Sequence, residues 1–139
     1  MTVSEKKEES DKVTEKLIAF LQGKEFHALI TYEPFADEVD ITAVTNYFRE
    51  EWKNIVVLPQ STENILIPEN GLIIVPGRAF TREWKRIGRW AGFYDKLLDN
   101  NPSLTSIGVC FSYQIFENLP QDTWDQQIDE VVFAENILE

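Results

Sequence analysis

The sequence predicts a three-layer α/β/α sandwich with a mostly parallel sheet, folded as a single domain over residues 1–139. Two observations support this class. Continuous apolar runs at 54–59 and 71–76 end at prolines, a pattern typical of strands that are buried on both faces. Segments with helical apolar spacing alternate with such runs, and this alternation indicates a parallel sheet covered by helices through right-handed crossovers. A chain of 139 residues suits one hydrophobic core.

The amino-terminal half predicts two helices and a strand. The first helix is expected over about 10–22, ending at Gly23, while the Glu- and Lys-rich residues 1–9 are expected to fray. A strand over 27–32 follows. Asp40 is a suitable capping residue for the second helix. The apolar residues that share one face are Val13, Leu17, Phe20 and Leu21 in the first helix and Ile41, Val44, Phe48 and Trp52 in the second.

The carboxyl-terminal half continues the alternation after the two apolar runs. Phe93, Leu97 and Leu98 predict a third helix that begins near Gly92. Residues 105–111 predict another strand, and a short last strand is expected near 131–133. All of these strands are expected to belong to one sheet.

Composition excludes several classes of function. The net charge of -11 disfavours a nucleic-acid or anionic membrane surface, which requires an excess of Lys and Arg. No apolar run approaches the roughly 20 residues of a membrane helix. The amino terminus has neither a secretory apolar region nor an Arg-rich import pattern. A soluble, cytoplasmic protein is therefore expected, and a monomer.

The chain contains one cysteine, Cys110, and one histidine, His27, so it has few nucleophiles or metal ligands of these types. Cys110 lies in an apolar run, where a buried thiol usually acts as a small hydrophobe. A structural role is favoured for His27 as well, because no second His or Cys accompanies it. Catalytic triads and zinc chemistry are weakly supported.

A basic island stands out in this acidic chain. Between Arg78 and Arg89 there are five basic residues and one acid, Glu83. Two alternatives remain open for it: a binding loop for a small anion, or a solvated basic loop. The position favours the first, because the island lies between a buried strand and the start of a helix, where backbone N–H groups can bind phosphate.

The same region resembles a known family signature. The residues that carry the resemblance are Pro76-Gly77-Arg78-Ala79-Phe80 and Arg86-Ile87-Gly88-Arg89-Trp90-Ala91-Gly92-Phe93-Tyr94-Asp95. They resemble the 5-formyltetrahydrofolate cyclo-ligase family, in which a Pro-Gly-x-Ala-Phe turn precedes Arg-Leu-Gly-x-Gly-x-Gly-Tyr-Tyr-Asp. Flanking similarity at 32–40 and 124–132 extends the match over most of the chain. The resemblance implies an enzyme that converts 5-formyltetrahydrofolate to 5,10-methenyltetrahydrofolate with ATP and Mg²⁺.

The resemblance also implies roles for individual residues. The nucleotide-binding loop would comprise Arg86, Ile87, Gly88, Arg89, Trp90, Ala91, Gly92, Phe93 and Tyr94, with Arg89 and Tyr94 as catalytic residues. The reduced folate would contact Glu38, Arg89, Gly92 and Phe93. Asp95 and Asp129 would bind the metal. Without the resemblance, Glu38 fits a solvated acid before a helix and Asp129 a turn residue at a strand entry.

Two departures from the family pattern leave a second functional class open. The printed sequence has no counterpart of the family's amino-terminal helix with Lys and Arg, so a short form is expected, and Trp90 stands where the family has Gly. The first hypothesis is an active cyclo-ligase. The alternative is a non-catalytic relative that binds folate, nucleotide or a partner.

Overall fold

The structure is a computed structural model of the chain. It describes residues 2–51, 54–58, 67–77, 79–81, 86–87, 93–116, 128–134 and 136–138. Within these ranges, no helix is long and apolar enough to cross a membrane.

The centre of the molecule is a six-stranded sheet in the order β2-β1-β3-β6-β8-β9. Its strands are β1 (Ala28–Tyr32), β2 (Asn54–Leu58), β3 (Leu72–Pro76), β6 (Thr105–Val109), β8 (Glu130–Phe133) and β9 (Asn136–Leu138). Neighbouring strands pair in parallel except β8 and β9, which are antiparallel. The predicted mostly parallel sheet is therefore confirmed, and β9 is a strand that the apolar pattern did not predict.

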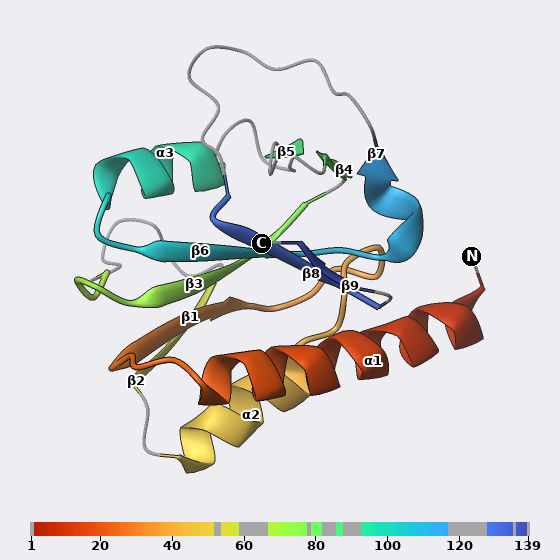
Figure 1. Ribbon diagram of the computed structural model, residues 1–139, viewed down its shortest axis with the longest axis horizontal. Helices are drawn as coiled ribbons and strands as arrows, with labels where there is room; N and C mark the ends of the chain where they lie inside the picture. Colours follow the sequence, from red (N-terminus) through yellow and green to blue (C-terminus); the bar gives the residue numbers. More distant parts are fainter. Residues whose placement is uncertain are drawn as a thin grey trace.

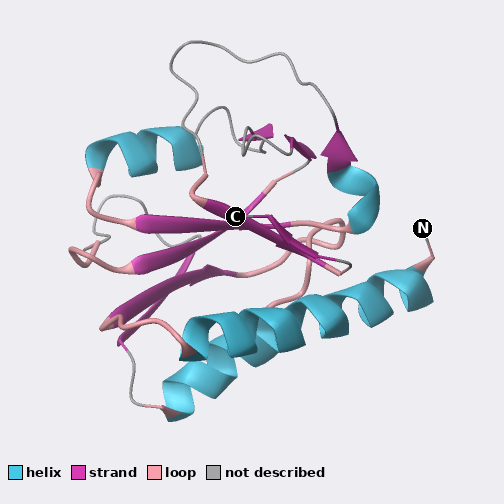
Figure 2. Cartoon of the chain, viewed as in Figure 1, coloured by secondary structure: helices cyan, strands magenta, loops and turns pink. Residues whose placement is uncertain are grey.

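Helices cover both faces of this sheet. Helix α1 (Val3–Gln22) and helix α2 (Thr42–Glu50) lie on one face, and α3 (Phe93–Asn100) lies on the other (Figures 1 and 2). Each interface has its own core cluster: Leu17 and Val44 belong to the first, and Phe80 and Leu98 to the second. The predicted three-layer α/β/α sandwich is confirmed.

Helix α1 begins at Val3, so the predicted start near Ser10 is wrong. The reason is a capping box. The Glu5 N–H donates to Thr2 Oγ1 at 3.0 Å, and the Thr2 N–H donates to Glu5 Oε1 at 3.1 Å. These bonds occupy backbone donors that an uncapped helix end leaves without partners. The helix consequently extends through the residues that were expected to fray.

The remaining predicted elements agree closely with the structure, with one difference in burial. Helix α2 begins at Thr42 with Ile41 as its N-cap, so the predicted cap, Asp40, lies one residue too early; its Oδ1 nevertheless accepts a hydrogen bond from the Thr42 N–H at 3.0 Å. Trp52 lies outside the described residues. Strand β3 is buried throughout, whereas β2 is only partly buried. Strand β2 lies at the edge of the sheet, and strand order is not visible in a local apolar run.

A second, smaller sheet was not predicted. It consists of β4 (Ala79–Thr81), β5 (Arg86–Ile87) and β7 (Ile115–Phe116), in the order β5-β4-β7. Part of the predicted basic loop therefore forms strands, in which Phe80 pairs with Arg86. Strands of two or three residues carry too little periodicity to be predicted. The fully buried ring of Phe80 anchors this sheet against β6.

Candidate functional site

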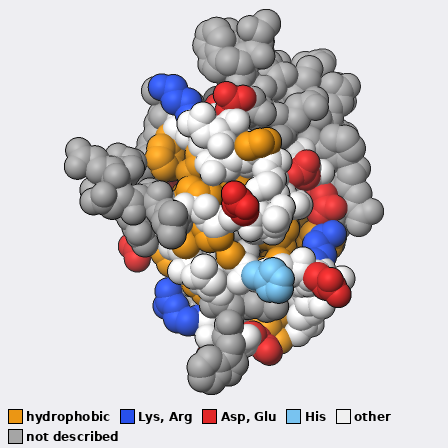
Figure 3. Space-filling model, turned by 90° about the vertical axis from the view of Figure 1, so that its left-hand side faces the viewer, with side chains coloured by type: hydrophobic (Ala, Val, Ile, Leu, Met, Phe, Trp, Pro, Cys, Tyr) orange, Lys and Arg blue, Asp and Glu red, His pale blue; other side chains and the backbone are white. Residues whose placement is uncertain are grey.

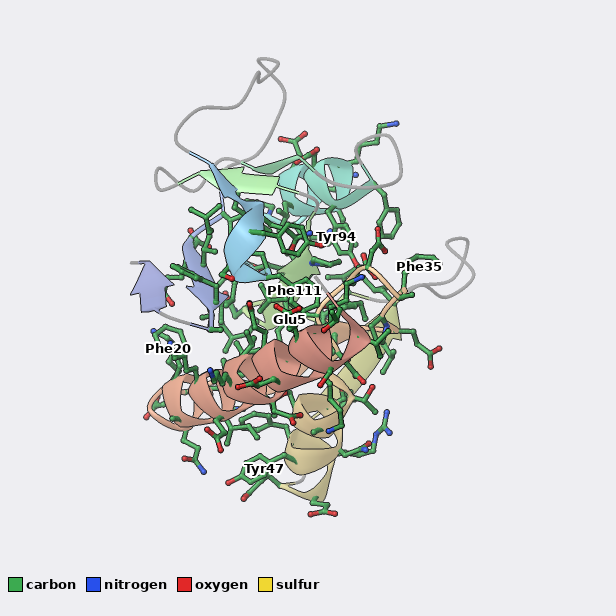
Figure 4. The ribbon with its side chains drawn as sticks, turned by 90° about the vertical axis from the view of Figure 1, so that its right-hand side faces the viewer. Glu5, Phe20, Phe35, Tyr47, Tyr94 and Phe111 are labelled. Carbon is green, nitrogen blue, oxygen red and sulfur yellow. The ribbon has the colours of Figure 1, made fainter. Side chains whose placement is uncertain are left out.

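A cavity lies at the carboxyl edge of the parallel sheet, on the side covered by α1 and α2. Its volume is about 600 Å³, within the range of ligand pockets. Its walls come from the first half of α1, the loop after β1, the start of α2, and Phe111 after β6. Figure 4 shows Phe111 above the first turns of α1, where Glu5 is labelled, and Phe35 to one side. In doubly wound sheets, ligands bind at this edge.

The loop after β1 is held by hydrogen bonds from both of its ends. The Tyr32 hydroxyl donates to the Val39 carbonyl oxygen at 2.7 Å, and the Asp40 N–H donates to Ser10 Oγ of α1 at 3.0 Å. Burial raises the pKa of the Tyr32 hydroxyl well above its ordinary value, and the Glu38 carboxylate adds to the shift. The hydroxyl therefore remains a donor, and the loop is fixed against the sheet.

Helix α1 is tied to the same edge by Glu9. The Ser112 N–H donates to Glu9 Oε1 and the Ser112 hydroxyl donates to Glu9 Oε2, both at 2.8 Å. Ser112 begins η2, a short 3-10 helix (Ser112–Gln114) that directly follows Phe111. Together with the bond between Ser10 and Asp40, these contacts hold the first half of α1 as a wall of the cavity.

Glu38 is a predicted substrate residue that does lie at this cavity. Its side chain is half-buried, and Glu38 Oε1 accepts a hydrogen bond from the Phe35 N–H at 2.8 Å. The Glu38 N–H in turn donates to the Phe35 carbonyl oxygen at 2.9 Å. This turn orients the carboxylate, and the exposed Phe35 side chain lines the same cavity.

Phe93, Tyr94 and Asp95 lie at the start of α3, on the opposite face of the sheet. Tyr94 and Asp95 are buried, and Phe93 is half-buried. The rings of Phe93 and Tyr94 meet edge to face with centroids 5.1 Å apart, within the core cluster under α3. None of the three belongs to the described wall of the cavity. The structure thus does not bring Phe93 and Glu38 into one described pocket.

Asp129 lies just before β8 and contacts the start of β6. Its Oδ2 accepts hydrogen bonds from the Ser106 N–H at 2.8 Å and from the Ser106 hydroxyl at 3.1 Å. The Asp129 N–H donates to Ser106 Oγ at 3.0 Å. These contacts favour a strand-entry role for Asp129. In the described part of the chain, no group of three or more His, Cys, Asp or Glu residues could hold a metal ion.

The remaining predicted site residues are in the signature loop. Gly88, Arg89, Trp90, Ala91 and Gly92 lie outside the described residues. Of Arg86 and Ile87, only the backbone is described, as strand β5. The described elements that border the loop are therefore the small sheet and the start of α3.

Cys110 and His27 play no part in the described cavity wall. Cys110 is fully buried, and burial raises the pKa of its thiol. This confirms its prediction as a small hydrophobe. His27 is exposed just before β1, at the amino edge of the sheet, and is the pale blue side chain in Figure 3.

Of the residues that line the cavity, only Glu38 was predicted as a site residue, and those that were missed include Lys6, Phe35 and Phe111. A signal for Lys6 was present. Lys6 and Ser10 extend the inward-facing stripe of α1 at helical spacing, so a cation stands where apolar residues are expected. The short loops that contain Phe35 and Phe111 carry no comparable signal.

Comparison with known proteins adds independent information. The sequence profile of the 5-formyltetrahydrofolate cyclo-ligase family matches residues 59–134. A protein of Schizosaccharomyces pombe named probable 5-formyltetrahydrofolate cyclo-ligase is 33% identical over 79 residues, which cover 48% of this chain and 39% of that protein. The chain thus matches about two fifths of that relative's length.

Solved structures share the fold over nearly the whole chain. A 5,10-methenyltetrahydrofolate synthetase from Mycoplasma pneumoniae superposes with a TM-score of 0.82 at 23% identity, covering 97% of this chain and 90% of that one. The Aquifex aeolicus 5,10-methenyltetrahydrofolate synthetase superposes with a TM-score of 0.76 at 28% identity, covering 99% of this chain and 84% of that one. Because the family profile matches more than half of the 139 residues, the chain belongs to the 5-formyltetrahydrofolate cyclo-ligase family.

Proposed function

We propose that this chain converts 5-formyltetrahydrofolate to 5,10-methenyltetrahydrofolate with ATP and Mg²⁺. The observation that supports the proposal most directly is the cavity at the carboxyl edge, which is lined by the half-buried Glu38 carboxylate and by the Phe35 ring. Such a wall suits a flat heterocycle with N–H donors, because the carboxylate can accept hydrogen bonds while aromatic surface covers the ring. The reduced pterin of a folate has this chemistry.

The reaction solves a leaving-group problem. The formyl oxygen of the substrate attacks the γ-phosphorus of ATP, and the bond from that phosphorus to the bridging oxygen of ADP breaks. N10 then attacks the formyl carbon and gives up its proton to water or to the phosphate, and the bond from this carbon to the phosphorylated oxygen breaks, releasing inorganic phosphate. Phosphoryl transfer depends on positioning and charge neutralisation, so the absence of a catalytic triad is no obstacle.

In this proposal, Glu38 accepts hydrogen bonds from the pterin, and the signature loop handles the nucleotide. Arg86 and Arg89 would donate to phosphate oxygens, since guanidinium groups offer two parallel donors. Arg89 and Tyr94 would orient the reacting groups. Arg89, Gly92 and Phe93 would complete the folate contacts.

Mg²⁺ would neutralise charge on the phosphates, and it needs few carboxylates from the protein. Asp95, in the first turn of α3, is the carboxylate we propose to hold it. Asp129, the second carboxylate that the resemblance implies, offers only Oδ1 to an ion, since its Oδ2 already accepts both bonds from Ser106, so Mg²⁺ binding is proposed to depend on Asp95. The protein is proposed to act as a cytoplasmic monomer.

The test is a spectroscopic assay of the purified protein. Mixing it with 5-formyltetrahydrofolate, ATP and Mg²⁺ is expected to produce the absorbance of the methenyl product, and omitting ATP is expected to abolish it. No ATP-dependent signal at high protein concentration would refute the activity. The alternative is a relative that binds folate or nucleotide without turnover, and Trp90, which stands where the family signature has Gly, favours it. Calorimetric titration with each ligand detects such binding in a protein that shows no activity.

A further inference from the structure

The cavity at the carboxyl edge carries an uneven distribution of charge. Its described wall contains two lysines, Lys6 and Lys7, and three acids, Asp11, Glu38 and Asp40. An anionic ligand is therefore repelled by the acids and binds best beside a cation that has no anionic partner. The partners of each charged group show which cation meets this condition.

Most of these charges already have partners. Lys7 Nζ lies 3.3 Å from Asp11 Oδ2, so this exposed lysine already has an anionic partner. Asp40 Oδ1 accepts from the Thr42 N–H and hydroxyl at 3.0 and 2.6 Å. In the described part of the chain, the Lys6 ammonium forms no ion pair or hydrogen bond. Lys6 is thus the available cation of the wall.

The position of Lys6 on α1 directs it towards the cavity. Lys6 lies one turn before Ser10 on the helix, and Ser10 Oγ accepts a hydrogen bond from the Asp40 N–H at 3.0 Å. The next turns of the same face bury Val13 and Leu17 completely. Lys6 is accordingly half-buried, whereas Lys7 and Lys12 are exposed.

We propose that the Lys6 ammonium binds a carboxylate of the glutamate tail of the reduced folate and so selects folates over pteroates, which lack this tail. The inference rests on the proposed function, because it takes the cavity as the folate site. The pterin lies against Glu38 and Phe35 on the loop after β1, and the tail lies along α1. The acids of the wall disfavour the reverse orientation, since they repel the tail carboxylates.

The test measures binding without ATP, so that no turnover interferes. Wild-type protein and Lys6→Ala are titrated calorimetrically with 5-formyltetrahydrofolate and with 5-formyltetrahydropteroate. Wild-type protein is expected to bind the folate more tightly. Lys6→Ala is expected to weaken folate binding about tenfold and leave pteroate binding unchanged, because one charge-assisted hydrogen bond is lost. Lys6→Arg is expected to retain most of the preference.

Lys12→Ala is the matched control. Lys12 lies on the same helix, pairs with Glu8 at 3.6 Å, and is not part of the described cavity wall. Its removal is expected to leave both affinities unchanged. Equal binding of folate and pteroate by wild-type protein, or an unchanged preference in Lys6→Ala, would overturn the role of Lys6 while leaving the proposed function intact. Failure of wild-type protein to bind either compound would overturn both.

Discussion

At the scale of single residues, side chains of α1 determine the shape of the cavity. Glu9 accepts two hydrogen bonds from Ser112, and Ser10 accepts one from the Asp40 N–H. These three bonds join α1 to two segments at the carboxyl edge of the sheet, η2 and the loop after β1. The first half of the helix, although rich in charged residues, is therefore held in place as a fixed part of the cavity wall.

Cys110 allows a prediction about alkaline pH. Its folded-state pKa is raised by burial and by the Glu9 carboxylate, so the folded protein keeps a proton that the unfolded chain releases. The resulting stability is fully present below the unfolded thiol pKa, roughly 8.5, and is lost as pH rises towards the folded-state pKa. The loss is expected to reach about 2 kcal/mol by about pH 10.

Urea denaturation of wild-type protein and Cys110→Ala between about pH 7.5 and 10 measures this effect. Other titrating groups are common to both proteins, so the difference between the two curves isolates the thiol. The variant is expected to show the shallower decline. Parallel curves would mean that the thiol ionises equally in both states.

Asp95 and Asp129 are expected to separate metal binding from folding. Asp95→Asn removes the proposed Mg²⁺ ligand with little change in size, so Mg²⁺-dependent ATP binding should be lost while stability is largely kept. Asp129→Ala leaves the buried Ser106 N–H and hydroxyl without their partner, so stability should fall by about 1–3 kcal/mol while nucleotide binding persists.

Calorimetry with ATP at low and high Mg²⁺, together with urea midpoints, gives both readouts for each variant. The strand-entry role of Asp129 predicts opposite outcomes for the two substitutions. If Asp129→Ala instead abolished the Mg²⁺ dependence and kept its stability, Asp129 would be a metal ligand.

At the scale of elements, contact between the two sheets depends on a glycine. A Cβ at Gly108 of β6 would lie 2.6 Å from Phe80 Cε1, inside van der Waals contact. The Phe80 ring is fully buried and cannot move aside easily. Gly108→Ala is therefore expected to cost about 1–3 kcal/mol of stability, and it should reduce the activity by displacing β4 and β5.

A double-mutant cycle with Phe80→Leu tests this explanation. The smaller side chain makes room for the new methyl group, so the double variant is expected to lose less stability than the two single variants together. Gly23→Ala is the control, since a Cβ there would have its nearest neighbour at an ordinary 3.7 Å. Strictly additive losses would show that the Phe80 ring is not the obstacle.

The elements also show how much a local sequence pattern can predict. Strands β1 and β3 and the buried face of α1 were predictable, because apolar runs and helical spacing reflect burial directly. The start of α1 was missed although Thr2 and Glu5 carry the capping-box pattern, because charge density suggested fraying. The exposure of β2 and the small second sheet depend on strand order and long-range pairing, which no local window contains.

The candidate site shows the same division. Glu38 was predicted from the family resemblance, and the structure places it on the cavity wall. Asp129 was predicted by the same resemblance, yet its described contacts are to Ser106. Lys6 was missed because it lies in a charged segment that was expected to fray. Only when α1 is known to begin at Val3 does Lys6 fall on the inward-facing side of the helix.

At the scale of the whole molecule, electrostatic repulsion opposes folding. The net charge of -11 is distributed over a chain of 139 residues, and the compact state brings these charges closer together than the unfolded state does. Salt screens such repulsion, since the Debye length falls from roughly 30 Å at 0.01 M to about 8 Å at 0.15 M.

The melting temperature is therefore expected to rise by a few degrees when NaCl is raised from about 0.01 to 0.15 M, as for a gain of about 1 kcal/mol in stability. Thermal denaturation followed by circular dichroism measures the shift. The matched variant replaces the exposed Glu25, Glu50 and Glu69 by Gln, which removes three negative charges without touching the cavity. This variant should melt higher at low salt and respond less to NaCl. An equal or larger response in the variant would mean that salt acts through a few specific ion pairs and that the net charge is not the cause.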